Sequence, residues 1–322
     1  MKRIVLMAAA AALSAAPVAA QTAPIADHHQ HLFSPVIAAE LARTTPGFHT
    51  ITASDVIALL DSAGIRQALL LSVAYIYGSP SRSFDDEYGK VREENDWNAA
   101  QAAQYPDRLI AFCGFNPLKD YALAELERCA RNPNLRRGIK LHFGNSDVQL
   151  ENPAHVTQLR RIFRAANTHH MAIVVHMRAS ISKKRPYGAR QARVFLDRLL
   201  PVARDVPVQV AHFAGSGPGY DDPPADSAMA VLAAAVERHD PRTRNLWFDV
   251  ASIVDPNISP SNAALVVRRI HQVGVKRVLY GSDAAAGTNL RPRESWAAFR
   301  RLPLREDEFA QIAANLAPYF TR

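Results

Sequence analysis

Several apolar segments of the sequence end in residues that commonly bind metal ions. His29 and His31 follow the first such segment, His176 and His212 follow two later ones, and Asp283 follows the last. Residues two apart on an extended strand point the same way, so His29 and His31 would present two imidazoles together. A single buried histidine is more often structural. Buried histidines and carboxylates are costly unless paired or metal-bound, however, and one ion satisfies all of them, so we expect a metal site.

Short apolar runs rich in Val, Ile, Leu and Phe predict eight parallel strands that are buried on both faces. They cover residues 25–29, 68–73, 109–115, 138–143, 172–177, 208–213, 246–250 and 277–281. Their alternation with helical stretches at this chain length favours a single-domain (β/α)8 TIM barrel, and an open doubly wound sheet is the alternative. Barrel enzymes build their sites at the carboxyl ends of the strands, where the candidate ligands fall.

Helices are expected over residues 54–63, 85–104, 152–169, 188–203, 225–239 and 259–274. Ser54 is the expected cap of the first, with Gly64 as its stop. The pairs Asn152-Pro153 and Ser259-Pro260 each place a capping residue before a proline at the first helical position.

The N-terminus predicts a signal peptide over residues 1–20. Lys2 and Arg3 precede an apolar run over 4–16, which is too short for a membrane span, and small residues at 18–20 predict cleavage after Ala20. An uncleaved anchor is the alternative. We expect a periplasmic or secreted protein whose barrel domain covers residues 21–322.

Composition narrows the partners to small molecules. The net charge of +8 falls to +6 when Lys2 and Arg3 are removed (8 − 2), and no basic stripe interleaved with aromatics suggests nucleic-acid binding. No later segment is apolar enough to suggest a membrane partner, and a homo-oligomer is compatible with the sequence. Cys113 and Cys129 are expected to be buried free thiols. Without a CxxC motif, a thiolate zinc site is not expected.

Taken in order, the motifs resemble one branch of a known superfamily. The segments are residues 27–32 (Asp-His-His-Gln-His-Leu), 138–142 (Gly-Ile-Lys-Leu-His), 281–283 (Gly-Ser-Asp) and 315–320 (Asn-Leu-Ala-Pro-Tyr-Phe), together with His176 and His212. Residues 106–109 and 115–117 add to the pattern. From about residue 25 to its end, the chain resembles the amidohydrolase-2 branch of the amidohydrolase superfamily. It departs from that branch after Asp283, where a proline often follows and 284–287 here is Ala-Ala-Ala-Gly.

The resemblance implies a metal-dependent mechanism. His29, His31, His176 and Asp283 would bind one divalent ion, with Zn²⁺ the expected metal, and His212 would lie beside it as a further ligand or an acid/base. An ion with an open coordination position can lower the pKa of water to about 7. Asp283 would then accept a proton, and His212 would polarise the scissile carbonyl.

Three further residues are candidates for substrate binding. The resemblance implies that Lys140 either orients substrate or a ligand, or is carboxylated and bridges a second metal; a structural salt bridge is the alternative. His142 shares its face of the strand with Lys140. Arg178, two residues after His176, has the chemistry to grip a substrate carboxylate bidentately, whereas the basic stretch after it is more simply a solvated surface. Asp249 either holds a ligand histidine or is structural, and it stays unassigned.

Three functions are compatible with these residues. The first is hydrolysis of a carboxylic ester, lactone or amide, and the substrate of this reaction can itself carry a carboxylate. The second is non-oxidative decarboxylation of an aromatic or unsaturated acid, which the same branch includes. The third is a non-catalytic periplasmic binding protein, which would tolerate loss of His212. We favour the first, but the first two need the same ligands, so the motifs do not separate them, and fold alone does not fix the reaction.

Overall fold

The computed structural model describes residues 22–285 and 289–321. Eight strands form one sheet in which each strand pairs in parallel with the next along the chain. They are β1 (Ala26–Gln30), β2 (Gln67–Leu71), β3 (Leu109–Gly114), β4 (Gly138–His142), β5 (Ala172–His176), β6 (Val208–Val210), β7 (Leu246–Asp249) and β8 (Val278–Leu279). The predicted signal peptide lies outside the described residues.

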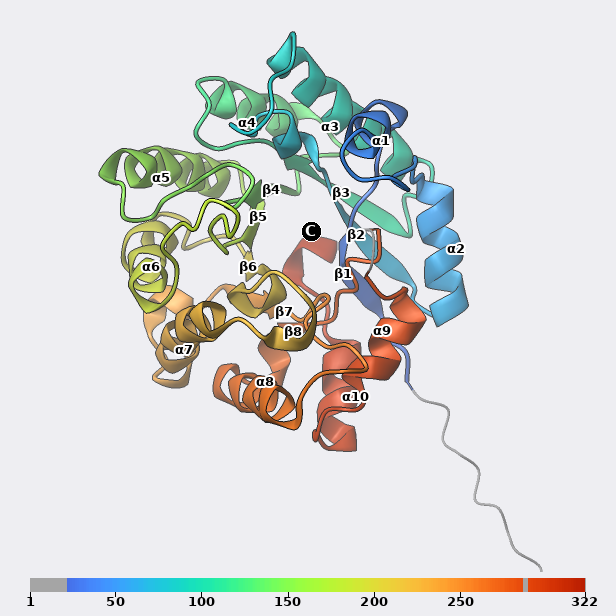
Figure 1. Ribbon diagram of the computed structural model, residues 1–322, viewed down its shortest axis with the longest axis vertical. Helices are drawn as coiled ribbons and strands as arrows, with labels where there is room; N and C mark the ends of the chain where they lie inside the picture. Colours follow the sequence, from blue (N-terminus) through green and yellow to red (C-terminus); the bar gives the residue numbers. More distant parts are fainter. Residues whose placement is uncertain (1–21, 286–288, 322) are drawn as a thin grey trace, which may run out of the picture.

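The first and last strands meet, so the sheet is a nearly closed barrel. The backbone N–H of His28 donates to the carbonyl of Tyr280 at 2.9 Å, and the N–H of Asp283 donates to the carbonyl of His29 at 2.8 Å. Figure 1 shows the helices as a ring around these strands. The predicted (β/α)8 barrel is therefore confirmed, and the open doubly wound sheet is wrong.

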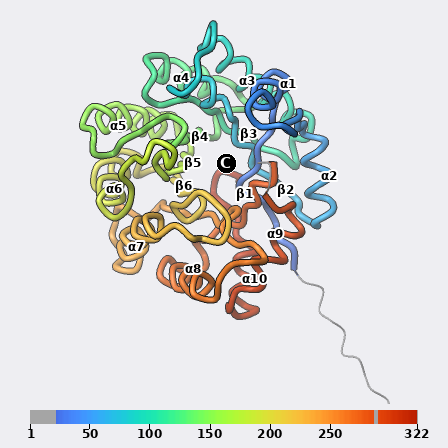
Figure 2. Tube along the Cα trace, viewed as in Figure 1, coloured from blue at the N-terminus to red at the C-terminus, as the bar shows by residue number. Residues whose placement is uncertain are grey.

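The second to the eighth helices follow one another around the ring in chain order (Figure 2). The helices are α1 (Pro35–Ala42), α2 (Ala53–Ala63), α3 (Glu87–Ala103), α4 (Ala122–Arg131), α5 (Pro153–Thr168), α6 (Ala189–Val194), α7 (Pro223–Glu237), α8 (Pro260–Val273), α9 (Pro292–Phe299) and α10 (Glu306–Ala314). Within the described ranges, no helix combines the length and apolar character needed to cross a membrane.

Local sequence explains most of the helix ends. Asn152 and Ser259 cap α5 and α8 as predicted, and Gly64 ends α2 in the left-handed conformation, with φ 70°. The cap of α2 is Thr52, however, and not Ser54. The Thr52 hydroxyl accepts from the N–H of Asp55, whose carboxylate accepts from the N–H of Thr52, and this reciprocal pair satisfies two otherwise free donors.

The single helix expected over 188–203 is shorter in the structure. It begins as α6 and continues as a π-helical turn (Phe195–Leu199) and a 3-10 turn (Leu200–Val202). Pro201 has no N–H, so an α-helical hydrogen bond cannot form there.

Apolar side chains fill one end of the barrel interior, and histidine, lysine and aspartate side chains lie at the other end. An interior cluster contains Leu71, Phe112 and Val174, together with Tyr319 from the C-terminal segment. The C-terminal segment lies at the centre of the ring (Figure 1). Side chains two apart on a strand share a face, so His176 faces the same interior as Val174, one step closer to the carboxyl end of β5. The fold thus presents the predicted ligands at the expected end of the barrel.

The two cysteines form a disulfide bond, so the prediction of free thiols is wrong. Cys113 lies on β3 and Cys129 on α4, with Cα atoms 6.2 Å apart, a separation that a disulfide can span. An apolar context suggested buried thiols for each residue separately. The packing of the strand and the helix after it decides that the two thiols meet.

Candidate metal centre

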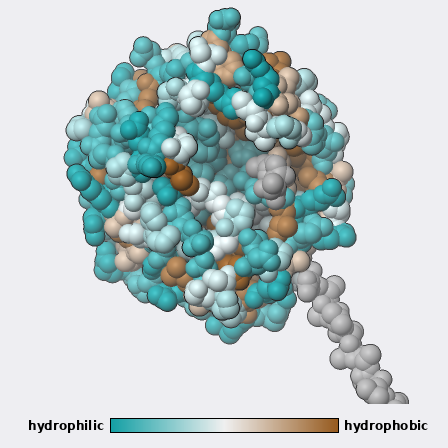
Figure 3. All heavy atoms as spheres, viewed as in Figure 1, coloured by the Kyte–Doolittle hydropathy of each residue, from teal (hydrophilic) through white to brown (hydrophobic). Residues whose placement is uncertain are grey.

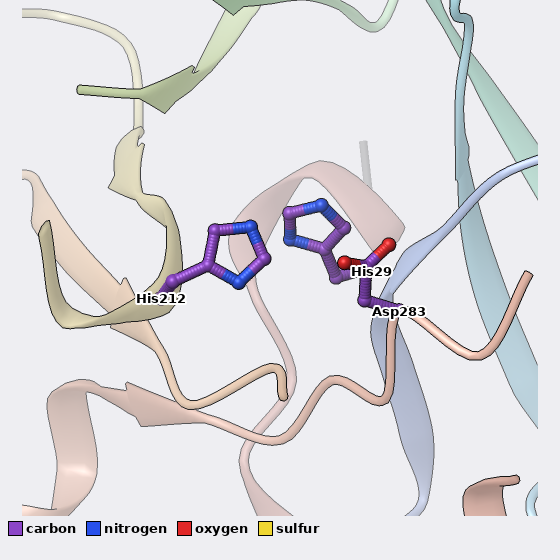
Figure 4. Close-up of side chains that lie close together, drawn as sticks. All are labelled: His29, His212 and Asp283. Atoms are coloured by element: carbon purple, nitrogen blue, oxygen red, sulfur yellow. The ribbon is translucent and has the colours of Figure 1, made fainter. Parts of the chain in front are cut away.

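Three of the predicted functional residues converge at the carboxyl ends of the strands. His29 lies on β1, His212 in the turn after β6, and Asp283 after β8. One ligand atom from each lies within 4.8 Å of the others, and all three residues are buried. Figure 4 shows the two rings and the carboxylate directed toward one another. Residues more than 250 positions apart in the chain (283 − 29 = 254) are thus brought to one point.

His31 and His176, also predicted as ligands, lie at the edge of this group. His31 Nε2 is 3.5 Å from Asp283 Oδ1. The His176 ring stacks on His142, with centroids 3.9 Å apart, and its centroid is 5.1 Å from that of His212. Among the described residues, the closest group therefore contains His212 in place of two of the four predicted ligands.

The backbone is strained at two of the converging residues. His212 and Asp283 have φ angles of 53° and 55°, in the left-handed region that residues other than glycine rarely adopt. Each such residue costs about 1–3 kcal/mol, and such strain clusters at functional sites. The N–H of His212 donates to Asp249 Oδ1 at 2.8 Å, which helps to hold this conformation.

Gly281 allows the end of β8 to approach β1 closely. A Cβ atom at this position would lie 2.8 Å from the Cβ of His29 and 3.2 Å from that of Ala251. Both separations are shorter than ordinary van der Waals contact, so a larger residue here would push Asp283 away from His29.

Asp249, which the sequence left unassigned, orients His29. The ring Nδ1 of His29 lies 3.0 Å from Asp249 Oδ2. Burial opposes ionisation of Asp249, but the hydrogen bonds from the His29 ring and from the N–H of His212 lower its pKa below the usual range. An ionised carboxylate only accepts, so Nδ1 of His29 carries the proton and Nε2 offers a lone pair. Asp249 is therefore the carboxylate that fixes the tautomer of a candidate ligand.

Main-chain carbonyls fix two further imidazoles in the same way. His31 Nδ1 donates to the carbonyl of Leu71 at 2.6 Å, and His212 Nδ1 donates to that of Ala251 at 2.8 Å. A carbonyl oxygen cannot donate, so each neutral ring keeps its lone pair on Nε2. Burial lowers the pKa of His31 well below its ordinary value, which keeps this ring neutral. His29 and His31 thus offer unprotonated Nε2 atoms, and Nδ1 of His212 is held by a carbonyl so that its Nε2 faces the site.

The arrangement fits a divalent cation. Asp283 Oδ1 is buried without a hydrogen-bond partner in the described structure, and it faces His31 Nε2 at 3.5 Å. Two acceptors at this distance repel unless a cation or a proton lies between them. Burial raises the pKa of Asp283 to about 6, so its carboxylate is only weakly stabilised by the protein alone. Imidazole nitrogens with a carboxylate oxygen are ligands that Zn²⁺ and similar metals accept.

Lys140 lies against the candidate ligands at the base of the site. Its Nζ is 3.2 Å from His29 Nε2, and the side chain is buried. Burial lowers its pKa to about 8. Within the described residues, Lys140 has no carboxylate close enough for a salt bridge, so the structural alternative is not observed.

The His142 ring offers a hydrogen-bond donor, whereas the rings of His29 and His31 offer lone pairs. Its Nδ1 accepts from the N–H of Asn145 at 3.1 Å, and burial lowers its pKa well below the ordinary value. The neutral ring therefore carries its proton on Nε2. This residue lines the same cavity as the candidate ligands, so it can donate a hydrogen bond to a substrate oxygen.

Arg178 already binds a carboxylate of the chain itself. Its Nε and Nη2 donate to the two oxygens of Asp222 at 2.7 and 3.2 Å, and its guanidinium lies over the Tyr187 ring. It lines a neighbouring cavity, which shares His142 and His176 with the cavity around the metal centre. Asp222 thus accepts the two hydrogen bonds that Arg178 was predicted to donate to a substrate carboxylate.

The cavity around the metal centre has a volume of about 350 Å³. It is lined by the five candidate ligands, by Lys140, His142 and Arg82, and by an apolar wall of Phe33, Leu41, Phe48, Val73, Tyr75 and Ile76. The face of the ring in view in Figure 3 is hollowed near its centre. The size and mixed lining suit a small molecule with polar and apolar parts.

Two residues of the site were missed by the sequence analysis. Asp27 accepts from the N–H groups of His29 and Ser282 and from the Ser282 hydroxyl, and so ties β1 to the segment before Asp283. Its position two residues before His29 was the available signal. Arg82 lies in the loop after β2, outside any motif, and nothing in the sequence singled it out.

Comparison with known proteins identifies the family. The model of the amidohydrolase family matches residues 71–315, which is most of the chain. The comparison with curated proteins finds no match.

Solved structures share the fold at low sequence identity. A 2,6-dihydroxybenzoate decarboxylase complexed with 2,6-dihydroxybenzoate is 16% identical, with a TM-score of 0.64 over 93% of this chain and 100% of that one. A Novosphingobium aromaticivorans 5-carboxyvanillate decarboxylase, complexed with manganese and a nitrobenzoic acid, is 16% identical, with a TM-score of 0.62 over 94% and 97%. A probable 2-pyrone-4,6-dicarboxylic acid hydrolase from Acinetobacter baumannii is 18% identical, with a TM-score of 0.56 over 90% and 96%.

The barrel, the converging histidines and aspartate, and the family match agree with one another. The chain belongs to the amidohydrolase family and is a metal-dependent enzyme of the (β/α)8-barrel type.

Proposed function

We propose that the enzyme hydrolyses a carboxylic ester, lactone or amide of a small organic acid. The observation that carries this proposal is the buried, unpartnered Oδ1 of Asp283, directed at a cluster of imidazole lone pairs. His29, His31 and Asp283 are the proposed core of the metal site. His176 and His212 are the two candidates for the remaining ligand position, and Zn²⁺ is the proposed metal, although a related decarboxylase binds manganese.

Each residue has a role that follows from its protonation. A divalent cation bound here would polarise a carbonyl and lower the pKa of water. Asp283 accepts the proton that the attacking water loses. Where His176 takes the ligand position, Nε2 of His212 can accept this same proton from Asp283 and pass it to the leaving group, so that one proton moves from water to the leaving group. The Nε2–H of His142 donates to a substrate oxygen, and Lys140 stabilises negative charge at the base of the cavity.

Non-oxidative decarboxylation of an aromatic or unsaturated acid is the second candidate. The resemblance of the fold to decarboxylases of 2,6-dihydroxybenzoate and 5-carboxyvanillate supports it. The cavity also has an apolar wall against which a flat ring can pack. In this reaction the same group, Asp283, would deliver a proton to the carbon that loses CO₂.

Elemental analysis followed by product analysis tests the proposal. We expect about one divalent ion per chain, loss of turnover on chelation, and recovery when the ion is restored. A panel of lactones, esters, amides and hydroxybenzoic acids then separates the reactions, because only decarboxylation releases CO₂. Full turnover by metal-free enzyme would refute both candidates. Turnover of hydroxybenzoic acids alone, with release of CO₂, would replace the first candidate by the second.

We also propose that the protein is exported and that residues 1–20 are removed. The disulfide between Cys113 and Cys129 supports this, because such bonds persist in oxidising compartments and are rare in the cytosol. The intact mass of protein purified from its native host should correspond to a chain that begins at Gln21 and lacks two thiol hydrogens. A mass that includes residues 1–20, or two thiols that react with alkylating agent after denaturation, would contradict the proposal.

A further inference from the structure

Two basic side chains, Lys140 and Arg82, line the cavity around the metal centre, and they differ in how far they lie from the solvent. Lys140 is buried at the base, against His29. Arg82 comes from the loop between β2 and α3, and its side chain is 26% exposed. Arg82 is therefore the cation that a molecule in this cavity can reach from the solvent side.

The guanidinium of Arg82 is poorly satisfied. Its nearest carboxylate is that of Glu40, with Nη1 and Oε1 3.8 Å apart, which is beyond hydrogen-bond distance. Glu40 is also shared, because Arg43 donates to its other oxygen at 3.2 Å. Among the residues that the structure describes, the Arg82 side chain donates no hydrogen bond. Partly exposed pairs of this kind contribute little to stability, so a better carboxylate can replace Glu40.

Arg82 differs from Arg178 in its hydrogen-bond partners and in the cavity that it lines. Arg178 makes two short hydrogen bonds to Asp222 and faces the neighbouring cavity. Arg82 lines the cavity of the metal centre and has its donors unused. A substrate carboxylate would have to displace Asp222 from Arg178, whereas at Arg82 it would gain bidentate hydrogen bonds that the protein does not supply.

The rest of the wall defines what lies between Arg82 and the metal centre. Its apolar members, among them Phe33, Phe48 and Tyr75, provide no charge and suit a rigid hydrocarbon framework. We propose that Arg82 binds a carboxylate at the end of the substrate remote from the reacting group. This rests on the proposed function, which places the reacting group at the metal centre. The substrate is then a molecule with an apolar framework that carries a carboxylate at one end, bound by Arg82, and a carbonyl or carboxyl group at the other end, which reacts at the metal centre.

Calorimetric titration with aromatic acids tests the inference without turnover. The probes are benzene-1,3-dicarboxylate and benzene-1,4-dicarboxylate, with benzoate as the reference that lacks a remote carboxylate. We expect wild-type enzyme to bind at least one dicarboxylate more tightly than benzoate. Arg82→Gln should weaken that dicarboxylate about tenfold or more and change benzoate less than twofold. Arg178→Gln should change the preference for the dicarboxylate less than twofold.

Glu40→Gln is the matched control, because it breaks the same ion pair by neutralising the carboxylate and leaves the Arg82 guanidinium in place. It should leave dicarboxylate binding unchanged or tighten it severalfold, opposite in sign to Arg82→Gln. Equal weakening of all probes by Arg82→Gln, a selective loss in Arg178→Gln, or no preference of the wild type would each overturn the inference. If the selective loss appears but no substrate of the panel is turned over, the proposed function fails and the Arg82 assignment stands.

Discussion

Replacing Asp283 by asparagine is expected to lower kcat by about two to four orders of magnitude, the range that a positioned acid or base contributes. The substitution preserves size but removes the group that exchanges a proton, and it puts an amide in place of the unpartnered carboxylate oxygen at the imidazole cluster. Metal content per chain should fall in the same variant. Steady-state kinetics and elemental analysis measure the two effects separately.

Asp255→Asn provides the control for this substitution. Asp255 lies in the loop after β7, outside the cavity of the metal centre, and its carboxylate accepts from the N–H of Asn257. This variant should keep wild-type turnover and metal content. If Asp283→Asn kept full turnover while remaining folded by circular dichroism, Asp283 would have no role in proton transfer.

Asp249→Asn is expected to weaken metal binding about 10–100-fold, as is typical when the group that orients a ligand is changed. The carboxylate of Asp249 accepts four hydrogen bonds. They come from the His29 ring at 3.0 Å, the Gln209 amide at 2.6 Å, and the N–H groups of His212 and Ala251 at 2.8 and 3.1 Å. The amide NH₂ of asparagine would face at least one of these donors. Leaving a buried donor unsatisfied costs about 1–3 kcal/mol of folding stability.

Asp27→Asn separates the two effects. Asp27 is also buried and accepts hydrogen bonds from His29, Gln30 and Ser282, but it contacts no imidazole ring. Both variants should lose stability in urea unfolding of the metal-free protein, whereas metal titration should show the larger loss for Asp249→Asn. Equal losses of metal affinity would mean that Asp249 acts through barrel closure and not through the His29 tautomer.

Strained backbone and buried polar groups concentrate where these two aspartates lie. His212 and Asp283 both adopt left-handed conformations, and each is held by a hydrogen bond to a neighbouring strand. Positions that depart from local preference in this way are expected at functional sites, because the surrounding fold must supply what the residue loses. The barrel therefore stabilises a geometry that no local segment would adopt alone.

Local patterns in the sequence were sufficient for the architecture and for most residues of the site. A buried parallel strand is recognisable from its own composition, and the position of a histidine directly after such a strand places it at one rim of a barrel. For this reason His29, His31, Lys140, His142 and His176 could all be assigned to the carboxyl ends of their strands, where the structure has them.

Only the tertiary structure shows which side chains from separate elements of the chain lie within bonding distance of one another. The disulfide between Cys113 and Cys129, the orientation of His29 by Asp249, and the pairing of Arg178 with Asp222 each join separate elements. The weakly paired Arg82 is of the same kind, since its environment is built by several loops. Hydrogen bonds and ion pairs depend on separations of a few tenths of an ångström, and side-chain periodicity carries no information at that precision.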